Sequence, residues 1–113
     1  MNFLPRWYVP PHKRMIKSLG ATRIIEAVAI EFGLTTSEMR SDCRKRKKAR
    51  ARQAAWYLIH RHCDHVTYPM MARMLGKKDH TTAMHGVATI GNLITRDDEL
   101  AKALARIEQA VRV

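Results

Sequence analysis

Residues 67–94, TYPMMARMLGKKDHTTAMHGVATIGNLI, predict two helices joined by a tight turn. Thr67 is a suitable N-cap for the first helix, whose pattern ends at Leu75, and Asp79 is a suitable N-cap for the second. Gly76 lies directly after the first helix, where a glycine commonly ends a helix because it adopts the left-handed backbone conformation. Two helices with so short a connection form a helix-turn-helix.

The second of these helices has two contrasting faces. Its apolar stripe consists of Ala83, Val87, Ile90 and Ile94. At about 100° per residue, the opposite side carries Lys78, Thr81, His85 and Asn92. Short hydrogen-bonding side chains are unusual on a simple surface helix, and they suit the donor and acceptor edges of bases in a major groove. The alternative is a polar face that binds nothing.

Helical periodicity also precedes this segment. The first pattern begins at Thr22, taken as an N-cap, and stops at Gly33. Its apolar face consists of Ile24, Ile25, Val28 and Phe32. Thr35 and Glu38 have the spacing of a capping box, which predicts a short second helix.

Two further helices complete the pattern. One should begin near Arg50, end near residues 64–66, and carry on one side Ala51, Ala55, Leu58, Ile59 and His62. The last should open with Thr95 and Asp98 and bury Leu100, Leu104, Ile107 and Val111. Because no segment alternates as a strand does, we predict an all-α fold, a compact helical bundle.

The chain is strongly basic. It carries 21 Lys and Arg residues against 10 Asp and Glu residues, giving a net charge of +11 and a pI near 10.4. Seven of the basic residues fall within nine positions, in the run RKRKKARAR at 44–52, which we expect to form a loop up to about Arg50. This surplus predicts an anionic partner: DNA, RNA or a membrane surface.

Two of these partners fit less well. A membrane-binding run carries large apolar residues on one face, and this run has only alanines, so no membrane contact is expected. RNA-binding modules usually stack bases on exposed aromatic side chains. Trp56 and Tyr57 are instead expected to pack beside Ala55 and Leu58.

Metal and enzyme sites are also disfavoured. His60, His62, Cys63 and His65 suggest a zinc site, but helical geometry separates His60 from His62 by about 200°, so no metal is predicted. Neither Cys63 nor Cys43 is accompanied by the acidic residue and glycine loop of a nucleophilic site. We therefore predict no catalytic residues, no enzyme and no cofactor.

Without a membrane span or a signal peptide, a cytoplasmic, nucleoid-associated protein with free thiols is expected.

The chain is divided into an N-terminal arm, residues 1–20, and one domain, residues 21–113. The first eleven residues contain three prolines and three aromatic residues, which is typical of an extended arm. Such arms usually pack on their own domain. The alternative is that the arm binds RNA polymerase or another protein.

Several segments resemble one known family. The string KKDHTTAMHG at 77–86, preceded by TYPMMARML and a glycine, resembles the signature of the DNA-binding domain of the bacterial replication initiator DnaA. RKRKKARARQAAWYL is similar to that family's basic loop and following helix, and IIEAVAIEFGLTTSEM to its opening helices. The resemblance covers roughly residues 23–110 and implies a helix-turn-helix bundle of the Trp-repressor-like class.

The resemblance also implies contacts with double-stranded DNA. Arg44 matches the loop arginine that enters the minor groove, where A·T-rich sequences concentrate negative potential. The residues that match the major-groove reader are Asp79, His80, Thr81, Thr82 and His85. Arg52 and Gln53 match positions that hold the phosphate backbone. The remaining basic residues expected to contact DNA are Arg46, Lys47, Lys48, Lys77 and Lys78.

The sequence departs from the family pattern at several positions. Lys77 and Lys78 stand where the family commonly has a second glycine and an arginine, and His60 and Cys63 stand where it usually offers a lysine and a threonine to phosphates. One extra residue stands near Val66. No GxxxxGK[ST] phosphate loop is present.

We therefore expect a stand-alone DNA reader of bacterial or phage origin. It would bind sites similar to DnaA boxes and regulate transcription or replication by occupying them. The alternative is an adaptor that keeps the fold for protein interaction, with weak or non-specific nucleic-acid binding.

Overall fold

The computed structural model of the chain describes the backbone of residues 11–41 and 45–111, with side chains from residue 20 onward. Within these residues it contains six helices and no strand. They are α1 (Pro11–Phe32), α2 (Thr36–Arg40), α3 (Arg46–His62), α4 (Tyr68–Met74), α5 (His80–Leu93) and α6 (Asp98–Val111). The prediction of an all-α fold with a helix-turn-helix, formed by α4 and α5, is confirmed.

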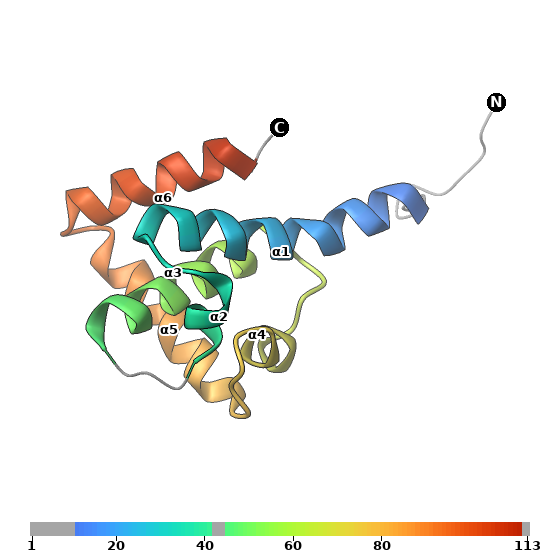
Figure 1. Cartoon of the computed structure of the whole chain (residues 1–113), viewed down its shortest axis with the longest axis horizontal. Helices are drawn as coiled ribbons and strands as arrows, with labels where there is room; N and C mark the ends of the chain where they lie inside the picture. The colour runs from blue at the N-terminus through green and yellow to red at the C-terminus, as the bar shows by residue number, and fades with distance from the viewer. Residues whose placement is uncertain (1–10, 42–44, 112–113) are drawn as a thin grey trace.

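Helix α3 lies in the middle of the bundle (Figure 1). Helix α1 packs on one side of it and α5 on the other, while α6 lies along α1 and α4 packs against α5. The short α2 contacts both α1 and α3. Because α3 is covered on two opposite sides, most of its length after the first turn must be apolar.

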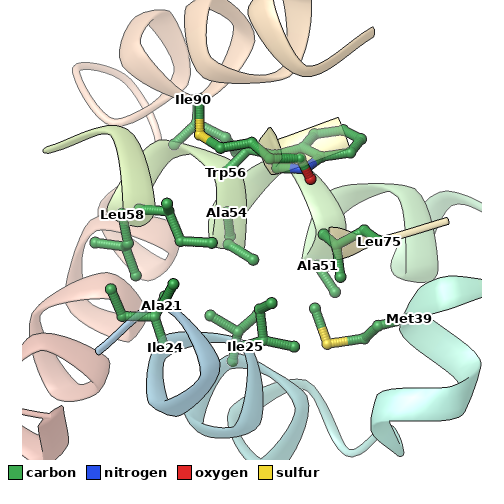
Figure 2. Close-up of a cluster of buried hydrophobic side chains, with 14 of the residues drawn as sticks. Ala21, Ile24, Ile25, Met39, Ala51, Ala54, Trp56, Leu58, Leu75 and Ile90 are labelled. Carbon is green, nitrogen blue, oxygen red and sulfur yellow. The ribbon is translucent and has the colours of Figure 1, made fainter. Parts of the chain in front are cut away.

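The side chains of the core show how α3 meets this requirement. Figure 2 shows Ala21, Ile24 and Ile25 of α1 on one side of α3, with Trp56 and Ile90 on the other. The alanines of α3 that are fully buried are Ala51, Ala54 and Ala55. Small side chains at these positions let neighbouring helices approach α3 closely, and the larger Leu58 and Ile59 fill the space further along it.

Trp56 joins α3 to both helices of the helix-turn-helix. Its indole is buried, and Nε1 donates a hydrogen bond of 2.8 Å to the backbone oxygen of Met71 in α4. On α5, Gly86 lies against the same ring: a Cβ there would come within 2.7 Å of Trp56 Cε3. The expectation that Trp56 packs inside the fold is confirmed, and the indole fixes α4 and α5 relative to α3.

Most predicted helix ends are confirmed. Thr35 and Glu38 form the capping box of α2, and the side chains of Thr67 and Asp79 accept hydrogen bonds from the first turns of α4 and α5. Gly33 and Gly76 have positive φ angles of 68° and 73°, the conformation that ends a helix readily only at glycine.

Three predicted helix starts are wrong. Thr22 lies inside α1, which begins at Pro11, and α3 begins at Arg46 rather than near Arg50. In α3 the first turn, residues 46–49, has no buried residue, so hydrophobic periodicity marks only the part of that helix that packs. Thr95 donates to the Asn92 backbone oxygen instead of capping α6, and Asp97 Oδ1 accepts from the Leu100 backbone nitrogen at that helix's start.

The buried residues predicted for the last helices are largely confirmed. Leu100, Leu104 and Ile107 are buried, and Val111 is partly buried. His62, expected on the packed side of its helix, is exposed and meets Glu108 of α6. Residues 11–20 are the first turns of α1, so the division into an arm and a domain at residue 20 stays a prediction.

The contact between Gly86 and Trp56 predicts that Gly86→Ala lowers the melting temperature. The added methyl group must displace a buried ring, which costs about 1–3 kcal/mol, and the better helix propensity of alanine offsets only about 1 kcal/mol of that. Gly91→Ala in the same helix is the control, because its Cβ would lie 3.9 Å from Tyr57 Cε1, an ordinary contact distance. We expect that variant to be as stable as the wild type or more so. Equal melting temperatures for the two variants would contradict the proposed close packing.

Candidate nucleic-acid interface

The first half of α3 and the first two turns of α5 border a shallow hollow. It is lined by Ala49, Arg52, Gln53, Trp56, Lys77, Thr82, His85 and Gly86. Five of these residues were predicted from the sequence to contact DNA. The fold therefore gathers polar side chains from two helices that are distant in the sequence.

The start of α5 presents a continuous exposed surface. The side chains predicted to read bases, Asp79, His80, Thr81, Thr82 and His85, are all exposed, as is Lys78. Asn92 continues the same face further along the helix. No buried polar group holds these side chains inside the fold, so their donors and acceptors face solvent.

Met84 is a residue of this surface that sequence reasoning missed. Its side chain is 41% exposed, although methionine is usually found in cores. At about 100° per residue it lies roughly 60° from Thr81 around the helix axis, and this angular position was the available signal. An apolar group here suits the methyl group of a thymine.

Asp79 has a structural role at the start of α5. Its Oδ1 accepts a hydrogen bond of 2.9 Å from the Thr81 backbone nitrogen. Hydrogen bonding by Thr81, through its side chain first and its backbone second, lowers the pKa of Asp79 below its ordinary value near 3.8, and the charges of His80 and His85 add to this. The carboxylate is therefore ionised at neutral pH while the helix end holds it in place.

The start of α3 is unusually positive. Lys45, Arg46 and Lys47 are exposed, and Lys48 lies 3.6 Å from Glu38 Oε2. The N-cap residue Lys45 makes no capping hydrogen bond, and the first turn has no acidic residue. Cations at the positive end of a helix dipole are unfavourable by themselves, so this arrangement is better suited to a helix end that meets an external anion.

The predicted basic loop is mostly helical. Residues 46–52 form the first two turns of α3, with Lys45 as its N-cap. Arg44, expected to enter the minor groove, lies outside the described residues. The basic side chains of the run from Arg46 onward are therefore presented by a helix.

Three of the predicted contact residues are engaged inside the protein. Arg52 is only 5% exposed, and its Nη1 donates to the backbone oxygen of Ser41 at 3.2 Å. Lys77 Nζ donates to the same Ser41 oxygen at 3.4 Å. Gln53 is half-buried and accepts from Arg50 Nη1 at 3.2 Å.

The histidine cluster near the end of α3 has other partners. His60 stacks on Tyr68 with ring centroids 5.2 Å apart, and His62 Nε2 lies 2.8 Å from Glu108 Oε2. Cys63 is buried, and burial raises the pKa of its thiol. These contacts connect α3 with the start of α4 and with α6.

Comparisons with known proteins agree on one family. The model described as "Bacterial dnaA protein helix-turn-helix" matches residues 21–90. The chromosomal replication initiator proteins DnaA of Gloeobacter violaceus and Sphingopyxis alaskensis are each 36% identical to the chain, over 74% and 78% of it. That of Nostoc punctiforme is 29% identical over 92% of the chain. The chain spans about a fifth of the length of these relatives, between 19% and 22% of each.

The matched segment contains most of the surface described above. Residues 21–90 run from α1 to the later turns of α5 and include the basic start of α3.

Among the helices of residues 11–41 and 45–111, none combines the length and the apolar character needed to cross a membrane.

The cap at Asp79 predicts a pH dependence of stability. Because the pKa of Asp79 is lower in the folded protein than its ordinary value near 3.8, its ionised form stabilises the fold above that value and the contribution is lost as pH falls below it. Asp79→Asn keeps a capping oxygen but cannot ionise. The free energy of unfolding, measured with urea, should therefore fall more for the wild type than for the variant as the pH is lowered from about 5 to 2. Parallel curves would show that the carboxylate does not act as an ionised cap.

Proposed function

The chain belongs to the bacterial DnaA helix-turn-helix family, and we propose that it binds double-stranded DNA sequence-specifically at sites similar to DnaA boxes. The observation that carries this proposal is the exposed polar start of α5 together with the basic start of α3, whose N-cap residue Lys45 makes no side-chain capping hydrogen bond. A helix of this kind fits a major groove, while neighbouring cations neutralise phosphates.

The first turn of α5 supplies the base contacts. Thr81 and His80 offer short hydrogen-bonding groups to base edges, and His85 follows Thr81 one turn later on the same face. Asp79 uses Oδ1 to cap the helix, and its second oxygen can accept a hydrogen bond from a cytosine amino group. The Asp79 carboxylate is held by its hydrogen bond at the helix start, and the other three side chains project from the fixed backbone of α5.

The phosphate backbone is held on both sides of this helix. The exposed Arg46, Lys47 and Lys78, with Lys48 at the edge, provide charge. Gln53 and Thr82 line the hollow between α3 and α5, where a phosphate oxygen can bind. These contacts set the position of α5 on the duplex without selecting a sequence.

Arg44 supplies the minor-groove contact in this proposal. It directly precedes Lys45, which stands at the exposed start of α3. An arginine inserted beside a major-groove helix favours A·T-rich flanking base pairs, because their minor groove is narrow and strongly negative.

The regulatory role follows from occupancy. The chain matches only the helix-turn-helix part of its relatives, and we assign it no catalytic step and no cofactor. In a bacterium or a phage-infected cell it would control transcription or replication by competing for sites in the nucleoid. The N-terminal arm is where RNA polymerase or another protein would bind. A protein-interaction adaptor is the alternative, and it predicts binding that changes little with salt, whereas phosphate contacts weaken steeply with salt.

Base reading by α5 is tested with Thr81→Ala. After the preferred site has been selected from a random DNA pool, this variant should lose about 1–3 kcal/mol on that site and little on random DNA. Lys47→Ala is the control, because loss of an exposed cation should weaken both DNAs alike and flatten the salt dependence by about one unit. If Thr81→Ala weakens both DNAs equally, α5 is not the reading helix.

Minor-groove reading is tested with Arg44→Ala and a change in the DNA. Replacing the A·T-rich flank by G·C pairs widens the groove and adds a guanine amino group, so wild-type affinity should fall. The Arg44→Ala variant should bind both DNAs about equally, since it lacks the group that distinguishes them. Affinities measured for the four combinations decide the matter: additive losses would show that Arg44 does not read that flank.

A further inference from the structure

The backbone carbonyl of Ser41 accepts hydrogen bonds from side chains of two different elements. Arg52 Nη1 of α3 donates to it at 3.2 Å, and Lys77 Nζ of the turn between α4 and α5 donates to it at 3.4 Å. Arg52 Nη1 also lies 3.5 Å from the Met39 backbone oxygen. Two long cationic side chains are thus directed toward the end of α2 and away from solvent.

The turn itself touches the same segment. Gly76 has a φ of 73°, and a Cβ on it would lie 2.6 Å from the backbone oxygen of Arg40. Only a residue without a side chain permits this approach, so the turn packs directly on the last residue of α2. Lys77 is the next residue, and its contact with Ser41 extends this packing by one residue.

The segment held in this way leads to Arg44. Ser41 is fixed at one side by these contacts, and Lys45 is fixed at the other side by the start of α3. Consecutive Cα atoms are about 3.8 Å apart, so the three peptide units between Ser41 and residue 44 can span at most about 11 Å. The position of Ser41 therefore limits where Arg44 can reach.

We propose that Lys77 and Arg52 are positioning residues that hold the Ser41 backbone against the helix-turn-helix, so that the minor-groove arginine stays in register with α5. The proposal rests on the function proposed above and deepens it, since it names what couples the readings of the two grooves. It differs from the role that the family resemblance implies for Arg52, a contact with phosphate. Lys77 would influence recognition of flanking base pairs without contacting them.

Lys77→Met tests this proposal, with the exposed neighbour Lys78→Met as the matched control. The dissociation constants are measured on three DNAs: the preferred site, the site with a G·C flank, and the site with one changed base in the major groove. In Lys77→Met the penalty for the G·C flank should shrink by about threefold or more, while the penalty for the major-groove change is kept. In Lys78→Met affinity for all three DNAs should fall by one factor, with a flatter salt dependence. Lys77→Arg should restore flank discrimination. The melting temperatures of all three variants should stay close to that of the wild type.

A second measurement needs no DNA. The Ser41 backbone nitrogen donates to Glu38 O at 3.2 Å, so its hydrogen exchange reports how firmly this segment is held. In Lys77→Met exchange at Ser41 should be about two- to tenfold faster than in the wild type or in Lys78→Met, because a hydrogen bond that holds this segment is lost.

The outcomes separate the two proposals. If the wild type shows no preference among the three DNAs, the proposed function fails, and hydrogen exchange still decides whether Lys77 holds Ser41. If the wild type discriminates but Lys77→Met weakens binding to all three DNAs by one factor, the positioning role is overturned and Lys77 is a phosphate contact. Unchanged hydrogen exchange at Ser41 in Lys77→Met also overturns the positioning role.

Discussion

The contact of the Trp56 indole with α4 and α5 is the constraint on which the arrangement of this protein depends. A buried indole N–H without a partner would be costly, so its hydrogen bond to Met71 fixes where α4 lies. The ring face against Gly86 fixes how near α5 can come. With both helices set by one side chain of α3, the first two turns of α5 lie against the first half of α3.

This constraint explains why basic residues close in sequence have different roles. Those at the start of α3 are exposed, whereas Arg52, further along the same helix, is buried and bonded to backbone oxygens. Lys77 and Lys78 are adjacent, yet only Lys77 is directed toward Ser41. In a protein with a net charge of +11, a cation can thus hold the fold together instead of binding an anion.

Exposed cations are concentrated at the start of α3, where the first turn has no acidic residue. Helix α6, on the other side of α1 (Figure 1), carries both signs: Asp98, Glu99 and Glu108 together with Lys102 and Arg106. Exposed pairs such as Arg106 with Glu31 contribute little stability by themselves. The cluster of cations at the start of α3 favours approach to an anionic polymer with that part of the surface first.

The amino-acid sequence alone determined the all-α class, the helix-turn-helix and its caps at Thr67 and Asp79, because these depend on short-range periodicity and on hydrogen bonds within a few residues. The same local signals placed Thr81 and His85 on the exposed side of α5. They failed at the start of α1, at the start of α3, where the first turn has no buried residue to give a periodic signal, and at Thr95, where Asp97 caps the helix instead. Only the tertiary structure decided that Arg52 is buried, that Lys77 meets Ser41 across 36 positions of sequence, and that Gly76 must lack a side chain to clear Arg40. The physical reason is that burial and long-range hydrogen bonds depend on which helices pack together, and here that packing follows from one indole ring.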